Sequence, residues 1–431
     1  MKLVHGIIGI CFSVVVMQGV IKPGVRTAGV EPAVTYFKEQ ASLFAASTIK
    51  LQLAIAAIKE NDSLSVVDAR KALIQCRINY KRIEFFLEYF FTSSAMIYNR
   101  APKYEIEEPY MEYQEPVGLQ FIESMLFEKQ VTIRKTDLLQ QVDAVQSSAA
   151  DLSALLYGFQ ATDQQLLESM RLELIRVITL HISGFDAPSL KSGITEAAAA
   201  LEAMQQTVKP FLTKNMARAD SVTKYLSGSI GYLQQHPNFD AFNRLHFLAR
   251  WALPLQQHFG KLIGELHLEL NTTGGVLNYR AADIFSTDAL NLSAFPGAPA
   301  YPNAALEQLG KLLFFEPGLS GNNKVSCATC HDPIKYFTDG LTQSIAIDGH
   351  SHVQRNASSL LYAGYQYGQF WDGRAKSLEE QVKVVMNNKQ EMNGGEGSIA
   401  TLLARKPDYN NKLATIFLVA FDSVTLSDKV A

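Results

Sequence analysis

Two thiols and an imidazole stand near position 330 at a spacing that suits covalent attachment of a cofactor. The run is Cys327-Ala-Thr-Cys330-His331, and C-x-x-C-H is the attachment pattern of a c-type haem. Two thiols three residues apart can form thioethers with the two vinyl groups on one porphyrin edge, and the next histidine is then held against the iron. The run therefore predicts a covalent haem c, with His331 as an axial ligand.

Two other uses of this run have less support. A zinc knuckle needs a second Cys/His pair at ligand spacing, but the only other cysteines are Cys11 and Cys76. A thioredoxin-like redox pair needs a βαβ context, which the flanking sequence lacks. Four cysteines are also too few for a disulfide scaffold, so haem attachment is the favoured interpretation.

Segments on both sides of the motif follow one another in an order that is typical of one family. Over about residues 305–431 the sequence resembles the N-terminal haem domain of the bacterial di-haem cytochrome c peroxidases. The segments that carry the resemblance are Leu309–Gly321, Asp332-Pro333, Phe337–Gly340, Arg355-Asn356, Phe370–Arg374 and Gln390–Asn393.

The resemblance implies a peroxidatic site with named residues. Cys327 and Cys330 would anchor the haem, and His331 would be its proximal ligand. Glu391 and Gln381, ten residues apart, match the glutamate and glutamine on the open side of the family's first haem. A carboxylate there can accept and return the proton that moves when hydrogen peroxide is split, an effect of roughly 10²–10⁴ in rate. An amide can orient the peroxide without titrating.

Some members of the family place a removable histidine on the distal side of this haem, shortly before Arg-Asn. His350, and secondarily His352, precede Arg355 in this way, although the spacing differs from the family's. Surface-loop histidines are the alternative for both. Trp371 is expected to pack beside the haem, and Arg374 to pair with Asp372 or with a haem propionate. Met386 and Met392 could be axial ligands in an electron-carrying cytochrome, but the resemblance places Met392 beside the glutamate, where it is expected to pack near the haem edge.

The family passes electrons through a second haem domain, but the sequence has no second C-x-x-C-H. We therefore expect the second haem in a missing C-terminal domain, since Thr425 or Ser427 resembles a helix cap just before the end. The alternative is a natural single-haem protein. The resemblance also implies a small electron donor such as a cytochrome c, calcium as a possible further ligand, and a possible homodimer.

These inferences together predict a cytochrome c peroxidase that reduces hydrogen peroxide to water. The main alternative is a single-haem cytochrome c that carries electrons or senses ligands without peroxidase activity. Oxidation of a protein or quinol substrate, as in related di-haem enzymes, is a further possibility.

The composition excludes two classes of protein. Hydrophobic residues make up 47% and charged residues 19% of 431 residues, which excludes general disorder. The 39 basic and 42 acidic residues give a net charge of −3, so nucleic acid is not an expected partner. Lys2 and the apolar run that follows to Ile21 predict a signal peptide or membrane anchor over residues 1–22, and hence export to the periplasm.

The elements that must position the haem motif fall into two regions of a mainly α protein. Helical patterns fill residues 31–271 and predict an up-and-down bundle almost without strands. We expect helices near 34–60, 65–98, 117–129, 134–159, 162–182, 193–215, 219–234 and 238–269. Turn residues and three prolines mark 272–303 as a linker. The family resemblance then implies a cytochrome c-like haem domain over 304–431.

Two segments of the helical half resemble the imelysin group of exported helical proteins. They are Arg77–Phe86 and Pro116–Glu123, but Gln120 replaces the histidine of that group's G-x-H-x-x-E pattern. Because an amide is a poorer metal ligand than imidazole, we expect no metal site here. Glu84 and Glu123 are expected to be paired carboxylates in the core, for example with Arg77, and the bundle to be non-catalytic. His181 and the other histidines of this half are expected to be structural.

Overall fold

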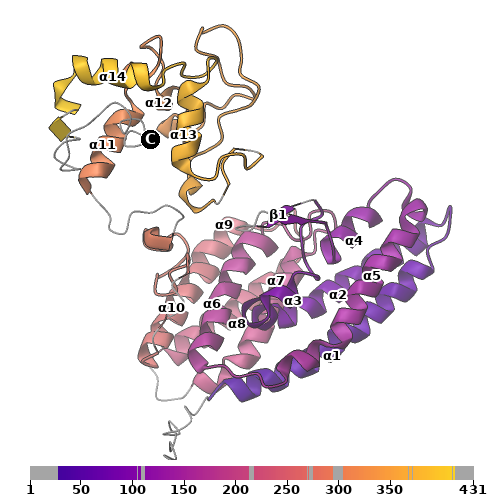
Figure 1. Cartoon of the computed structure of the whole chain (residues 1–431). Coiled ribbons are helices and arrows are strands. Elements are labelled where there is room, and N and C mark those ends of the chain that lie inside the picture. Colours follow the sequence, from indigo (N-terminus) through magenta and orange to yellow (C-terminus); the bar gives the residue numbers. More distant parts are fainter. Residues whose placement is uncertain are drawn as a thin grey trace, which may run out of the picture.

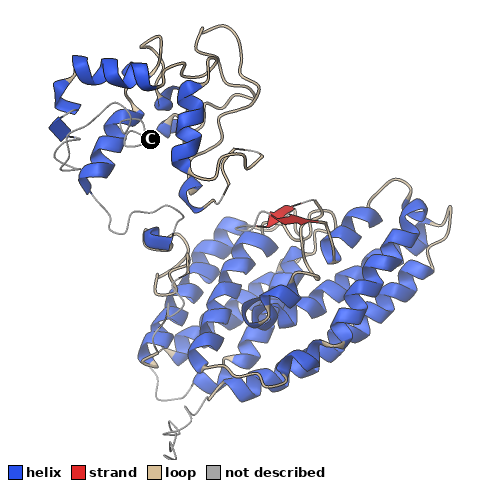
Figure 2. Ribbon diagram, in the orientation of Figure 1, coloured by secondary structure: helices blue, strands red, loops and turns tan. Residues whose placement is uncertain are grey.

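The protein is described by a computed structural model, which is mainly helical, as the sequence predicts (Figures 1 and 2). It describes residues 28–103, 105–107, 112–212, 218–268, 270, 275–294, 304–366, 368–370, 372–409 and 411–412. The N-terminal segment 1–22, Cys11, Trp371, Thr425 and Ser427 lie outside these residues, as does part of the expected linker. Of the helices within them, none combines the length and the apolar character that a membrane crossing requires.

Long helices build the N-terminal region. The α-helices are α1 (Val30–Ala56), α2 (Ser63–Phe90), α3 (Thr92–Ala95), α4 (Leu119–Leu126), α5 (Lys135–Ala150), α6 (Asp163–Arg176), α7 (Gly193–Thr207), α8 (Ala219–Gln235), α9 (Arg244–Phe247) and α10 (Leu253–Glu265). Short 3₁₀ turns lie at Val131–Arg134, Leu152–Leu156, Lys209–Phe211 and Leu292–Ala294. Two single-turn π-helices, Val177–His181 and Leu248–Ala252, continue α6 and precede α10.

The Asp62 carboxylate caps α2 by accepting hydrogen bonds from the backbone N–H groups of Leu64 and Ser65. The helix therefore begins at Ser63, two residues before the start expected from the sequence. The Ser65 hydroxyl, within the first turn, donates to the Asp62 carbonyl. Most apolar residues from Leu73 to Leu87 are buried, and α2 packs against α1 and α7.

Two short strands interrupt the helical pattern. β1 (Glu105–Glu107) and β2 (Glu112–Gln114) pair antiparallel, with Glu105 opposite Gln114. They lie between the helices expected near 65–98 and 117–129, in a bundle expected to be almost without strands (Figure 2). Charged residues there obscure the strand pattern, because glutamate is depleted in strands.

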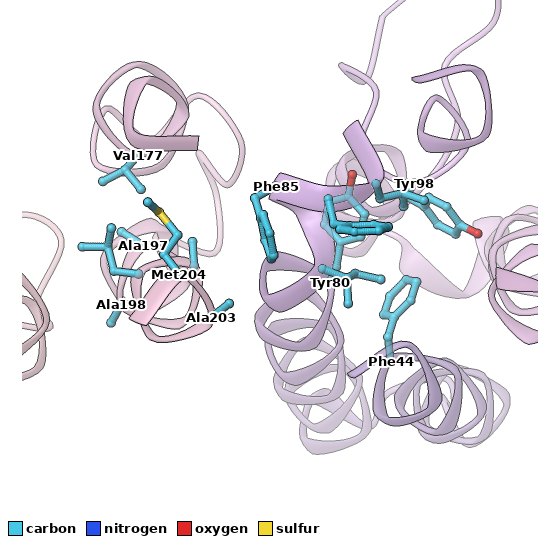
Figure 3. Close-up of a cluster of buried hydrophobic side chains, with 14 of the residues drawn as sticks. Phe44, Tyr80, Phe85, Tyr98, Val177, Ala197, Ala198, Ala203 and Met204 are labelled. Carbon is cyan, nitrogen blue, oxygen red and sulfur yellow. The ribbon is translucent and has the colours of Figure 1, made fainter. Parts of the chain in front are cut away.

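The bundle core is aromatic where α1 and α2 meet. The rings of Phe44, Tyr80 and Tyr98 lie with centroids 5.4–5.7 Å apart, and Figure 3 shows them converging from separate elements. On the other side of α2, Phe85 points toward small and flexible side chains of α7 such as Ala203 and Met204 (Figure 3). Alanines on α7 permit a close approach of the helix, and most side chains of α2 from Cys76 to Leu87 are buried.

The C-terminal region has short helices and long loops. It comprises α11 (Ala304–Phe314), α12 (Cys327–Cys330), α13 (Leu378–Asn387) and α14 (Glu396–Arg405), with 3₁₀ turns at Pro317–Leu319, Pro333–Lys335 and Ala363–Tyr365. Its separate core contains Leu309, Leu313, Leu319, Met386, Met392, Ile399 and Leu402. A core this small leaves much of the region's conformation to loop hydrogen bonds.

Candidate haem site

The two thiols of the motif lie on one short helix, α12. Ser326 caps it through a capping box, because its hydroxyl accepts from the Thr329 backbone N–H and the Thr329 hydroxyl accepts from the Ser326 N–H. Cys327 and Cys330 are one turn apart and therefore share a face of the helix. Both thiols are free and partly exposed. The cap thus presents two thiols side by side, as the sequence predicts.

His331 ends this helix with its ring held in one tautomer. Its Nδ1 lies 3.0 Å from the carbonyl oxygen of Phe337. A carbonyl can only accept, so Nδ1 carries a hydrogen, and in the neutral ring Nε2 then carries the lone pair. Metal-binding histidines are oriented by the same kind of second hydrogen bond. His331 is therefore preset to ligate a metal through Nε2.

Aromatic residues around the motif adopt an uncommon backbone conformation. Tyr336, Phe337, Tyr362 and Phe370 all have φ between 56° and 65°. Left-handed backbone is rare for bulky residues, and such strain concentrates at ligand and active sites. At Phe337 the strain has a visible consequence, because that turn directs its carbonyl at His331.

Large apolar side chains near the motif point to solvent. Ile334 is 90% exposed, Tyr336 75% and Tyr362 69%. The Ser359 hydroxyl donates to the Tyr336 carbonyl at 2.7 Å, which brings the segment with Tyr362 beside the one that follows His331. Exposed apolar groups of this size mark binding surfaces more often than ordinary surface.

Glu391 lies in a turn that hydrogen bonds fix from several directions. The Asn388 carbonyl accepts from the backbone N–H groups of Glu391 and Asn393. The Gln390 carbonyl accepts from Ile347, and Gly394 donates to the Met386 carbonyl at the end of α13. The backbone of Glu391 is thereby held between α13 and the loop 344–352.

The electrostatic surroundings of Glu391 connect it to the haem motif. Burial raises the pKa of Glu391, while the nearby Arg374 guanidinium lowers it in part. The pKa of the Cys330 thiol is in turn raised by burial and by the negative charges of Asp339, Glu391 and Cys327. Glu391 thus lies within electrostatic range of the thiol that would carry the haem, with a proton affinity above that of a solvated glutamate.

The sequence predicts the pairing of Arg374 with Asp372 but not its influence on Glu391. Its guanidinium donates to Asp372 at 2.7 Å, which confirms the expected pair. It also stacks over the Phe370 ring at 3.6 Å, and Asp372 has a second cation, Arg355, at 3.7 Å. Its influence on Glu391 has no signal in the sequence, because seventeen residues separate the two.

Gln381 lies half-buried in α13, which the Ser377 hydroxyl caps. The same helix ends at the Glu391 turn, so one short unit carries both residues predicted for the open side of the haem. Met386 and Met392 are buried in the core of this region, in keeping with packing.

His350 and His352 are both exposed. They lie on the loop 344–352, where Asp348 accepts from the backbone N–H groups of His350 and Ser351. Since Ile347 of that loop donates to Gln390, the loop lies beside the Glu391 turn, but His350 faces solvent.

The residues present fit a haem c. Two thiols on one helical face match the anchors that the group requires, and the oriented His331 ring matches its ligand. The adjacent exposed apolar side chains match its apolar walls. The partly buried Glu391 supplies a titratable group nearby.

The bundle contains a buried charge centre that the sequence identified incompletely. Glu84 and Glu123 are buried, as expected, but neither pairs directly with Arg77. Arg77 instead forms a bidentate pair with Glu196, at 2.8 and 2.9 Å. Glu84 contacts Lys81 and His181, and Glu123 accepts from the backbone N–H groups of Ser189 and Leu190. The expected pairing was wrong, because Glu196 lies 119 residues away in sequence and only the folded bundle brings it to Arg77.

Comparison with known proteins identifies the C-terminal region. The family model described as di-haem cytochrome c peroxidase matches residues 304–430. This stretch is a domain of that family. The comparison confirms the resemblance of this region, whereas the likeness of the bundle to imelysin proteins stays a prediction.

Three relatives match less than a third of this chain. A methylamine utilization protein MauG of Paracoccus denitrificans is 40% identical over 132 residues, 26% of this chain and 34% of that protein. Cytochrome c551 peroxidases of Nitrosomonas europaea and Pseudomonas aeruginosa are 37% and 34% identical, over 29% and 28% of this chain and 36% of each relative. The chain thus spans about a third of the length of these relatives.

Proposed function

We propose that the C-terminal domain reduces hydrogen peroxide to water at a haem c attached to Cys327 and Cys330 and ligated by His331. The observation that carries the proposal is that the domain holds both an oriented His331 and a partly buried Glu391 whose charge raises the pKa of the Cys330 thiol. The overall reaction consumes one peroxide, two electrons and two protons and yields two waters. The electrons come from a small redox protein such as a cytochrome c, and the domain acts in the periplasm.

The chain's own residues have distinct tasks in this reaction. When bound, the haem supplies the redox-active iron at which the O–O bond is cleaved. The Phe337 carbonyl keeps the His331 ring oriented, and the Glu391 carboxylate takes a proton from one peroxide oxygen and returns it to the departing one. Gln381 orients the peroxide through its amide. Because burial raises the pKa of Glu391, the carboxylate holds this proton more readily than a solvated one would.

An electron carrier without catalysis is the second candidate, and the structure gives it less support. Such a protein needs a sixth iron ligand, usually methionine or histidine. Met386 and Met392 are buried in the core of the domain, and His350 is exposed. In this candidate function, one of these side chains would have to leave the core or the solvent to serve as that ligand.

Steady-state turnover tests the proposal. The exported, haem-loaded chain is assayed with hydrogen peroxide and reduced cytochrome c, beside Glu391→Gln and the control Glu379→Gln, an exposed carboxylate on α13. We expect wild type and the control to turn over alike and Glu391→Gln to lose about 10²–10⁴-fold in kcat. Equal turnover in all three proteins would refute the role of Glu391. Absence of turnover in wild type with several small donors would favour the electron-carrier alternative.

A further inference from the structure

The bundle encloses a polar centre that the peroxidase chemistry does not use. Lys81 and Glu84 on α2, His181 at the end of the π-helix, and Asp186 in the following loop are all buried, with at most 1% of each residue exposed. π-Helical turns are rare and frequent at functional sites. This one turns the His181 ring toward α2, and Gly193 lets the chain approach closely, since a Cβ there would lie 2.1 Å from the His181 carbonyl oxygen.

Three of these side chains form a set of metal-ligand type. One oxygen of Glu84, one oxygen of Asp186 and one ring nitrogen of His181 all lie within 4.8 Å of one another. Two carboxylates and an imidazole suit zinc, cobalt and related divalent ions. The Glu173 Oε1, fully buried and without a hydrogen bond, lies 4.0 Å from the His181 Nε2 and adds a fourth oxygen at the rim.

A cation already lies in this set, and the chain supplies it. The Lys81 ammonium contacts Glu84 Oε1 at 2.6 Å and also Asp186 Oδ2. Glu84 Oε2 lies 2.9 Å from His181 Nε2, so this carboxylate bridges the ammonium and the imidazole. Gln120 closes the other side of Asp186 by donating to its Oδ1 at 3.3 Å.

The electrostatics are consistent with a permanently charged lysine. Burial by itself would lower the pKa of Lys81, but the Asp186 and Glu84 carboxylates raise it above the ordinary value. Burial would likewise raise the pKa of Glu84, but Lys81 and His181 lower it. A buried carboxylate pair without a cation would carry a large desolvation cost, so the centre requires one positive charge at this position.

We infer that Lys81 is the resident cation of a latent metal site. In the native chain its ammonium takes the place of a divalent ion, and the bundle folds without metal. Removing the ammonium opens a site for one divalent transition-metal ion, bound by Glu84, Asp186 and the His181 Nε2.

Cobalt binding to the full, haem-loaded chain tests this inference. Lys81→Ala is compared with wild type and with Lys71→Ala, which removes the exposed partner of Asp68 at the same i,i+3 spacing on the same helix. Calorimetry and elemental analysis after gel filtration report binding, on protein freed of affinity tags. We expect Lys81→Ala to bind one Co²⁺ per chain more than wild type and Lys71→Ala. At about 100 times the Kd, Co²⁺ should raise its Tm by roughly 5 °C or more.

Two further variants make the result decisive. Lys81→Ala combined with His181→Ala is expected to lose the added Co²⁺, which assigns binding to this centre. The inference is overturned if folded Lys81→Ala binds no more Co²⁺ than wild type, or if wild type itself binds Co²⁺ in a manner lost in Glu84→Gln. If Lys81→Ala does not fold in EDTA, its refolding yield becomes the measurement. Recovery with Co²⁺ supports the inference, and failure with both Co²⁺ and ethylammonium contradicts it.

Discussion

In the bundle, the Arg77–Glu196 pair has no solvent exposure, whereas the Arg374–Asp372 pair of the C-terminal domain is about half exposed, at 47% and 44%. The bundle surrounds its charges with a large aromatic and aliphatic core. The haem domain combines a small core with strained aromatic residues and exposed apolar side chains. The buried Arg77–Glu196 pair is therefore expected to act mainly on stability, whereas Arg374 of the haem domain also lowers the pKa of Glu391.

The largest expected effect is the loss of covalently bound haem when its two thiol anchors are removed. Replacing both Cys327 and Cys330 by alanine eliminates the thioether anchors, so haem should be fully extracted by acidified acetone. Wild type should retain it through the same treatment. The far-ultraviolet signal of the bundle should stay, because its core is separate. Cys76→Ala is the control, since this buried thiol, whose pKa burial raises to about 12, should leave haem attachment unchanged. Covalent haem in the double variant would contradict the assignment.

The next largest effect is a loss of stability when a buried charge pair of the bundle is broken. Glu196→Gln leaves the Arg77 guanidinium buried without a counter-charge and should cost about 3–5 kcal/mol of unfolding free energy at pH 7. Asp240→Asn, which breaks the exposed pair with Lys191, should cost less than about 1 kcal/mol. Denaturant titration of both variants measures the difference. Similar costs would show that burial does not distinguish these pairs.

The same pair gives a pH dependence with a definite sign. Burial would raise the pKa of Glu196, but the Arg77 guanidinium and its hydrogen bonds lower it to about 2. Because the folded pKa lies below that of the unfolded chain, about 4.3, the pair stabilises fully above the unfolded value. This stabilisation is lost as pH falls toward about 2. The stability gap between wild type and Glu196→Gln should therefore narrow over this interval, and a constant gap would contradict the assignment.

A smaller effect is expected from Arg374→Gln. Arg374 lowers the raised pKa of Glu391, so its removal should raise this pKa further. If Glu391 acts as a base, the acidic limb of the pH profile of kcat/KM then moves to higher pH. Arg355→Gln, which contacts Asp372 at 3.7 Å, is the control and should shift the profile less. A change in rate without a shift of the limb would assign Arg374 a purely structural role.

These two regions also differ in how far the sequence predicts them. The proposed haem anchors rest on five consecutive residues, and the main helices follow from hydrophobic periodicity, because both signals are local. The sequence does not predict the partners of Arg77 and Lys81 or the strands within 105–114. It also does not predict that the Phe337 carbonyl lies beside His331. Ion pairs across more than a hundred residues depend on tertiary packing, and every residue offers a backbone carbonyl, so sequence gives no signal for this one.

The most direct test of the peroxidatic account is the visible spectrum of the haem-loaded chain before and after one equivalent of hydrogen peroxide. We predict a high-spin ferric spectrum that changes within the mixing time in wild type. In Glu391→Gln we predict the same starting spectrum and a much slower change. A low-spin spectrum that peroxide leaves unchanged in wild type, in both redox states, would contradict the account and support an electron-carrying cytochrome.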